Sequence, residues 1–353
     1  MFETVADFRR MAETAEAGLT AQMVGVAAQV APPFTRQRRQ AIALALQDIA
    51  PPCAELRRIW TAQMMLPEAR ALRFGHPDRS YFQALDGRLR IWNATQALLT
   101  SVLSRRPQPL MPEPAPADSA VEGQMLAYQR SFERLHGYFS PTPPDLYTQD
   151  VGRHGDLPYP FTKFFRLMQL ARRLLLAQGR RAPLAFLDVG CGVGLKLVQA
   201  AMFFDVVHGL EYDPGRAEVA ATLVDRSPRA NDRASHGDAL TFDGYGMFDV
   251  IYAYKPLSDP DLLQQMEARI VAQARPGAIL ILPYFDVDFR FEDIGLTRIH
   301  DTVFLTGGAR QDIRALLRRA GDVGTVLPSP DHRQDEGFAG PMREALRHWG
   351  HLA

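Results

Sequence analysis

The sequence predicts an α/β protein in which a mostly parallel sheet, covered by helices on both faces, is preceded by a helical N-terminal domain. Two observations lead to this prediction. From residue 184 onward, short apolar runs typical of buried parallel strands alternate with helical segments. Before that point the chain is rich in alanine, and its apolar residues recur at three- and four-residue spacing.

The helical first part covers residues 1–105, and we expect it to serve substrate or partner recognition or oligomerisation. Its clearest amphipathic helices are Gln37–Ile49 and Gly87–Leu103. The pairs Pro32-Pro33 and Pro51-Pro52 predict helix boundaries, because proline lacks a backbone N–H and clashes with the preceding turn. The apolar faces of these helices are compatible with a homodimer.

Residues 106–120 are rich in proline and alanine and lack hydrophobic periodicity, so they predict a linker. Residues 121–183 return to helical patterns. They lead into the α/β domain, which we expect to extend over residues 121–353.

The α/β pattern is a series of strands and helices in alternation. Strands are predicted over residues 184–190 (LAFLDVG), 206–212 (VVHGLEY), 248–254 (FDVIYAY) and 278–285 (AILILPYF). These are the first, second, fourth and fifth strands, and the third ends before Gly237. Helices are predicted between them over Leu195–Phe204, Pro214–Arg226 and Asp259–Ala274. Near the C-terminus, strand-like Asp301–Thr306 and Val323–Leu327 flank a helix over Ala309–Ala320, and no final antiparallel hairpin is evident.

A glycine-rich turn carries the strongest chemical signal. The first predicted strand ends at Asp188 and is followed by Gly190, Cys191, Gly192 and Gly194, after which a helix begins. Glycines allow unusual backbone dihedrals and let a ligand approach the main chain. The helix beyond the turn offers unpaired N–H groups at its N-terminus. The turn is therefore predicted to bind a nucleotide-like ligand.

The spacing of the glycines separates two ligand classes. A dinucleotide site needs the pattern G-x-G-x-x-G, but its last glycine position is occupied here by Leu195. The carboxylate of Asp188 is also unfavourable beside a pyrophosphate. The segment instead resembles motif I of the class I, Rossmann-like methyltransferases that use S-adenosylmethionine (SAM). The resemblance implies that Asp188 and the turn bind SAM and that S-adenosylhomocysteine is the product.

The resemblance continues at the ends of the next two strands. Glu211 stands where the family has an acid that accepts hydrogen bonds from both ribose hydroxyls, and Tyr212 where a side chain packs on adenine. Asp238 stands where an acid accepts from the adenine amino group, and Ala239 would present its backbone N–H to the ring. These motifs occur in family order. With the two strands that follow, the resemblance covers about 100 residues.

The methyl acceptor is expected beside the loop after the fourth strand, because ligands of open α/β sheets lie at the carboxyl ends of the strands. Tyr254 and Lys255 of that loop are the candidate catalytic residues. Tyr254 would wall the acceptor pocket, and Lys255 would hold an anionic group or act as a base. The loop differs from the Asn/Asp-Pro-Pro-Tyr/Phe motif of amino-methylating nucleic-acid enzymes, so a protein side chain or a small molecule is favoured as acceptor over a nucleic acid.

Further substrate-side candidates flank the motifs. The upstream segment Arg153–Tyr159 with Lys163 is expected to close the site, and Tyr159 and Lys163 are its candidates. After the fifth strand the candidates are Tyr284, Asp286 and His300.

Two short segments of this region also resemble one particular sub-family, the non-SET histone-lysine methyltransferases. The residues concerned are Gly155–Leu157 and Gly194–Ala201, although Lys196 stands where that group has an amide side chain.

Composition excludes several other classes. The formal net charge of zero argues against broad phosphate neutralisation, so nucleic acid is a possible but not a favoured partner. Cys53 and Cys191 form no metal-binding cluster, and we expect no metal. No secretory signal and no membrane-spanning stretch is visible, so we expect a cytoplasmic protein without membrane contact.

The leading interpretation is a SAM-dependent methyltransferase with an unidentified acceptor. The alternative is a non-catalytic SAM-binding regulator or assembly factor, which the long N-terminal region keeps open. A nicotinamide-dependent oxidoreductase is disfavoured by Leu195 and Asp188.

Overall fold

The chain forms two compact units in the computed structural model. The structure describes residues 4–32, 34–104, 108–111, 119–140, 158–226, 231–284, 287, 290–307, 313–324, 326 and 335–352. Unit 1 comprises Met1–Arg105 and Asp331–Leu352, and unit 2 comprises Arg106–Pro330.

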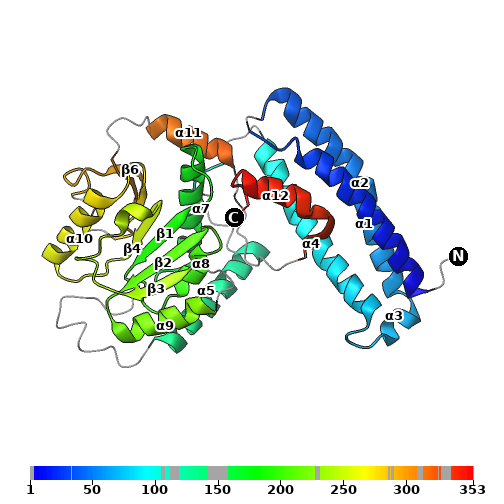
Figure 1. The fold of residues 1–353 in the computed structure, drawn as a ribbon, viewed down its shortest axis with the longest axis horizontal. Helices are drawn as coiled ribbons and strands as arrows, with labels where there is room; N and C mark the ends of the chain where they lie inside the picture. Colours follow the sequence, from blue (N-terminus) through cyan, green and yellow to red (C-terminus); the bar gives the residue numbers. More distant parts are fainter. Residues whose placement is uncertain are drawn as a thin grey trace. The chain divides into compact units, whose positions relative to one another are not determined.

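Unit 1 is helical (Figure 1). Its elements are α1 (Val5–Ala27), α2 (Arg36–Met64), α3 (Pro67–Ala71), α4 (Pro77–Leu103), the short 3₁₀ helix η3 (Gly337–Ala339) and α12 (Gly340–His348). Thr4 and Thr35 cap α1 and α2, because each side chain accepts a backbone N–H from the first turn of its helix. The helical N-terminal region is thus present as predicted.

Helix α2 corrects the helix boundary predicted at Pro51-Pro52. Both prolines lie inside the continuous helix, and Pro51 is exposed. The opposite face buries Ile49, Cys53 and Leu56 at helical spacing. The apolar contacts of that face hold the helix together despite the backbone hydrogen bonds that proline removes.

The C-terminal segment belongs to unit 1, whereas the sequence analysis included it in the α/β domain. Arg88 of α4 donates from Nε to Glu16 at 2.7 Å and from Nη1 to Asp335 at 2.6 Å. Arg343 of α12 donates to Thr95 of α4 at 3.3 Å. These contacts join residues almost 250 positions apart, which local sequence patterns do not reveal.

Unit 2 is built on a seven-stranded mixed sheet with the order β3-β2-β1-β4-β5-β7-β6. Its strands are β1 (Ala185–Val189), β2 (Val206–Glu211), β3 (Arg233–His236), β4 (Val250–Ala253), β5 (Ile279–Ile281), β6 (Thr297–His300) and β7 (Val303–Leu305). Strands β1 to β5 pair in parallel, and β7 pairs antiparallel to both β5 and β6. This confirms the predicted Rossmann-like, mostly parallel sheet.

The end of the sheet differs from the prediction. Strands β6 and β7 form an antiparallel hairpin across Asp301 and Thr302, which the sequence analysis did not identify. The following helix α11 is Ile313–Val323, so Val323 ends a helix instead of beginning a strand. Its apolar positions recur at helical spacing, and Leu316 and Ala320 are buried.

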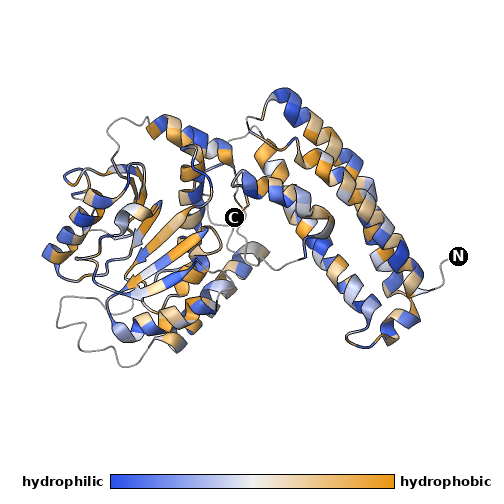
Figure 2. Cartoon of the chain, viewed as in Figure 1, coloured by the Kyte–Doolittle hydropathy of each residue, from blue (hydrophilic) through white to orange (hydrophobic). Residues whose placement is uncertain are grey.

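Helices cover both faces of the sheet (Figure 1). The helices of unit 2 are α5 (Ala120–Phe139), α7 (Phe161–Ala177), α8 (Leu195–Ala200), α9 (Pro214–Asp225), α10 (Pro260–Gln273) and α11, with the 3₁₀ helix η1 (Tyr245–Met247). One core joins α7, α8, α9 and α11 to the sheet face that carries Phe186 and Tyr252. A second core joins α10 and η1 to the face that carries Ile251. The central strands are accordingly hydrophobic (Figure 2).

Part of the predicted linker packs against unit 2. The guanidinium of Arg173, on α7, donates to the carbonyls of Gln108 at 2.8 Å, Pro109 at 2.7 Å and Ala320 at 3.1 Å. Burial lowers the pKa of Arg173 to about 10. Residues 108–111 are therefore fastened to α7 and α11, and Leu110 packs on the core.

In the part of the chain that the structure describes, no helix has an apolar stretch long enough to cross a bilayer.

Candidate functional site

The glycine turn joins the carboxyl end of β1 to α8. Gly190, Gly192 and Gly194 have positive φ angles of 76°, 56° and 83°. The N–H groups of Gly190 and Cys191 donate to the carbonyl of Leu210 at 2.8 and 3.1 Å. The turn is therefore tied to the end of β2 as well as to its own strand.

Two of these glycines are required by close packing as well as by their φ angles. A Cβ on Gly190 would lie 2.7 Å from the Cβ of Pro256, and one on Gly194 would lie 2.9 Å from the Cβ of Ala220. Because Pro256 follows β4, the first contact places the acceptor loop predicted from the sequence directly against the glycine turn.

Glu211 lies at the carboxyl end of β2 and is only 7% exposed. Its carboxylate accepts the N–H of Gly192 at 2.8 Å through one oxygen and the N–H of Asp213 at 2.9 Å through the other. Two backbone N–H groups therefore fix the orientation of the carboxylate.

The residues expected around adenine lie at the same edge of the sheet. Tyr212 is partly exposed, and its ring centroid is 6.3 Å from that of His236 at the end of β3. Oδ1 of Asp238 accepts the N–H of Leu240 at 2.9 Å. Ala239 is partly exposed, and its carbonyl accepts the Tyr245 hydroxyl at 2.7 Å.

Aromatic side chains gather where β1 and β4 end. Asp188 is fully buried and lies beside Tyr252 in the strand register. The ring of Tyr159 lies 6.0 Å from that of Tyr252 and 4.9 Å from that of Tyr254, edge to face in both pairs. Phe164 of α7 closes this group, with its ring 5.0 Å from that of Tyr252.

The phenols of Tyr159 and Tyr252 are held protonated. Burial, reinforced by Tyr254, raises the pKa of Tyr159 to about 12. Burial also raises the pKa of Tyr252 well above its ordinary value, and the Asp188 carboxylate adds to that effect. Near neutral pH, Tyr159 and Tyr252 therefore present aromatic surface and O–H groups rather than bases.

Lys255 adopts a backbone conformation that is rare for a residue with a side chain. Its φ is 43°, in the left-handed region, and it immediately precedes Pro256. Such conformations cost on the order of 1–3 kcal/mol and persist where the surrounding structure imposes them. Here the packing of Pro256 against Gly190 fixes the next residue of the loop.

Three other candidates lie apart from this group. Lys163 is exposed on α7. The hydroxyl of Tyr284 donates to Glu267 of α10 at 2.7 Å, within the core on the opposite face of the sheet. His300 ends β6, which is separated from β4 by two strands. The structure does not bring these three side chains to the tyrosine group.

The Cys191 thiol donates to the carbonyl of Gly192 at 3.7 Å, within the turn. Its side chain is 2% exposed and packs into the core near Gly209. Among the described residues, no group of three or more His, Cys, Asp or Glu side chains is arranged to hold a metal ion.

Sequence reasoning missed Tyr252, although the signal was present. Tyr252 and Tyr254 are two residues apart in an extended segment, so they project to the same side. The other upstream candidates, residues 153–157, and Asp286 lie outside the described residues.

No protein-family model matches the sequence, and no curated protein matches it. Solved structures of similar fold include a SAM-bound amino pentose methyltransferase from Micromonospora echinaspora involved in calicheamicin biosynthesis, at 25% identity and a TM-score of 0.29, covering 37% of this chain and 59% of that one. An RNA methyltransferase from Salinibacter ruber in complex with S-adenosyl-L-homocysteine is 20% identical with a TM-score of 0.31, and 44% of this chain matches 99% of it.

The [4+2]-cyclase SpnF is also among the similar structures. It is 23% identical with a TM-score of 0.25, covering 32% of this chain and 44% of that one. The chain thus spans about half the length of SpnF and of the amino pentose enzyme.

Proposed function

We propose that unit 2 binds SAM at the carboxyl edge of its sheet and transfers the methyl group to a protein side chain or a small molecule. The observation that carries the proposal is the Glu211 carboxylate, fixed by the N–H groups of Gly192 and Asp213 at the end of β2. A carboxylate oriented in this way has two acceptor oxygens, which suits the two adjacent hydroxyls of a ribose. It lies beside the glycine turn expected to face the rest of the cofactor.

The remaining cofactor contacts follow from the same edge of the sheet. Asp188 would face the amino-acid part of SAM, Tyr212 would pack on adenine, and Asp238 would accept from the adenine amino group. The backbone N–H of Ala239 would point to the ring. Tyr212, Asp238 and Ala239 are partly exposed, which leaves them accessible to a ligand.

When bound, SAM supplies a methyl group on a positively charged sulfonium, which leaves as a neutral thioether once the acceptor has taken the methyl. The role of the protein in this reaction is to align the acceptor with the methyl group and to exclude water. Tyr159 and Tyr254 form an aromatic wall beside the glycine turn, and their rings favour cations and apolar groups. Because the phenol of Tyr159 holds its proton, an acceptor proton would leave to Lys255 or to water.

A protein that binds SAM without turnover is the second candidate. Unit 1 favours it, because its described residues form a hydrophobic core of their own. A regulator or assembly factor would use such a unit to contact its partner.

Calorimetry on the full chain with SAM, S-adenosylhomocysteine and NAD tests the cofactor. We expect binding of the first two; binding of NAD without SAM would contradict the proposal. Methyl-labelled SAM is then incubated with the chain and either the proteins or the small molecules of a cell extract. Label in one fraction identifies the acceptor class, and SAM binding without label in either supports the non-catalytic candidate.

A further inference from the structure

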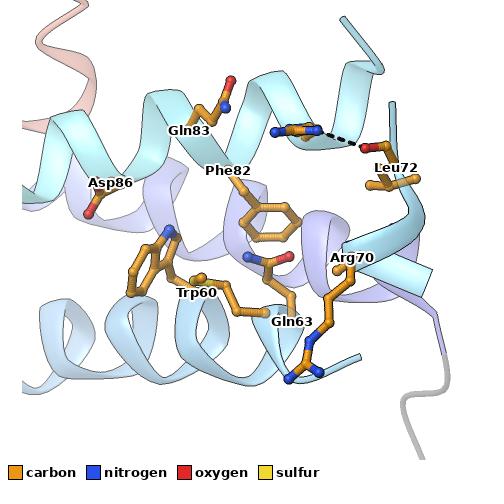
Figure 3. Close-up of a pocket in the computed structure, with 10 residues that line it drawn as sticks. Trp60, Gln63, Arg70, Leu72, Phe82, Gln83 and Asp86 are labelled. Carbon is orange, nitrogen blue, oxygen red and sulfur yellow. Dashed lines mark hydrogen bonds between the residues drawn. The ribbon is translucent and has the colours of Figure 1, made fainter. Parts of the chain in front are cut away.

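Unit 1 contains a cavity of about 320 Å³ between α2, α3 and α4 (Figure 3). Its apolar walls include Trp60, Met64, Leu72 and Phe82. The volume lies at the lower end of the range for small-molecule sites, roughly 300–1,000 Å³. The cavity is therefore large enough for a compact organic molecule.

A buried amide lies inside this cavity. Gln63 is 5% exposed, and Figure 3 shows its side chain between Trp60 and Arg70, facing the ring of Phe82. Within the described part of the chain, the Gln63 amide makes no hydrogen bond to protein. The amide carries both a donor and an acceptor, so it is available to bond to a ligand in the cavity.

The charged groups at the cavity leave an excess of positive charge. Arg79 donates to the carbonyl of Leu72 at 2.9 Å, which orients its guanidinium. Asp86, the acid in the lining, is already bonded to Arg90 at 2.5 Å. Among the described residues, no carboxylate forms an ion pair with Arg70 or Arg79. Two guanidiniums are therefore available to a ligand.

We propose that this cavity binds a small aromatic carboxylate. The ring would contact Trp60 and Phe82, the carboxylate would accept from Arg70 or Arg79, and the Gln63 amide would bond to the carboxylate or to a polar ring substituent. Guanidinium groups match the planar geometry of a carboxylate. This site lies in unit 1 and does not depend on the cofactor proposed for unit 2.

The test compares 3-phenylpropionate with its uncharged amide, 3-phenylpropionamide, on the full chain. Binding is followed by ligand-observed NMR and by tryptophan fluorescence, where Trp60→Phe identifies the signal that arises in the cavity. We expect the acid to bind at least about tenfold more tightly than the amide, because the charged hydrogen bonds are lost with the amide. Equal binding of the two, or binding of neither, overturns the proposal.

Arginine variants distinguish binding in the cavity from nonspecific attraction of the acid to positive charge on unit 1. Arg70→Gln removes an exposed guanidinium that makes no hydrogen bond within the described residues, so the fold is expected to survive, and Arg70→Gln/Arg79→Gln removes both. Arg73→Gln, an exposed arginine outside the lining, is the matched control. We expect the affinity for the acid to fall about tenfold in the double variant and to stay unchanged in the control. An equal loss in Arg73→Gln shows nonspecific attraction and overturns the proposal.

Discussion

The Glu211 carboxylate accepts the backbone N–H of Gly192 at 2.8 Å, so the end of β2 orients the glycine turn that follows β1. The same carboxylate accepts the N–H of Asp213, the residue that caps α9. One buried acid therefore fixes the turn, the strand end and the start of a helix. Any ligand bonded to Glu211 is placed relative to all three.

Glu211→Gln is expected to weaken SAM binding about ten- to hundredfold, since hydrogen bonds to a charged group contribute roughly 1.5–3 kcal/mol. The amide keeps the shape of the carboxylate, but its NH₂ group cannot accept from a backbone N–H or a ribose hydroxyl. Calorimetry with SAM measures the effect. Glu218→Gln, an exposed position on α9, is the control and should bind as the wild type does. Unchanged affinity in Glu211→Gln would show that the ribose assignment is wrong.

Gly194→Ala is expected to destabilise unit 2 by about 3 kcal/mol, through the strain of its positive φ and a clash with Ala220. Gly179→Ala separates these causes, because Gly179 has the same φ of 83° but no atom within 4 Å of an added Cβ. That control should cost about 1 kcal/mol, from strain alone. Chemical denaturation of the two variants gives the difference. Equal losses would show that packing at α9 does not constrain the turn.

The prediction from the sequence was strongest where a local sequence pattern alone determines the backbone conformation. Gly190, Gly192 and Gly194 have the positive φ angles that only glycine adopts readily, so the turn could be located from residue type alone. The apolar strands β1 and β4 are likewise buried along their length, apart from Ala185. In both cases short-range sterics and burial decide the structure.

The sequence-based predictions were wrong where contacts between distant parts of the chain determine the structure. The prolines in α2 break the local rule, and only the buried face of the helix explains why it continues. The joining of Asp335 to Arg88 depends on tertiary contact across the chain. Tyr284 follows a strand end as a substrate-side residue would, yet its hydroxyl is bonded to Glu267 in the core.

His208 makes the stability of unit 2 dependent on pH. Burial, reinforced by Arg233, lowers its pKa below the ordinary 6.5. Above pH 6.5 the imidazole is neutral in both the folded and the unfolded chain. As the pH falls below that value the unfolded chain takes up the proton first, so the free energy of unfolding decreases.

His208→Gln should therefore lose less stability than the wild type between about pH 7.5 and about pH 5, as measured by urea denaturation at both values. Glutamine can still bond to the Ser235 hydroxyl, which lies 2.8 Å from Nε2 of His208. His236→Gln, an exposed histidine on the neighbouring strand, is the matched control. If both variants show the wild-type pH dependence, His208 is not the group that makes the stability of unit 2 depend on pH.

Two buried tyrosines give opposite predictions for the same substitution. Tyr245 and Tyr252 are both fully buried. The Tyr245 hydroxyl donates to the carbonyl of Ala239 at 2.7 Å, whereas the hydroxyl of Tyr252 has no hydrogen-bond partner among the described residues. Tyr245→Phe should therefore lower the free energy of unfolding by about 1 kcal/mol, and Tyr252→Phe should leave it unchanged or raise it.

Thermal unfolding of the two variants, with and without SAM, tests both the packing and the function of Tyr252. If Tyr252 serves as an aromatic wall, Tyr252→Phe keeps its ring contacts with Tyr159 and Phe164 and should be stabilised by SAM as much as the wild type is. A smaller SAM-induced shift in this variant alone would mean that the hydroxyl bonds to the cofactor or to Asp188 in the bound state. The hydroxyl would then be a ligand-binding group that burial keeps protonated, because a phenol with a raised pKa donates its proton in a hydrogen bond but does not release it.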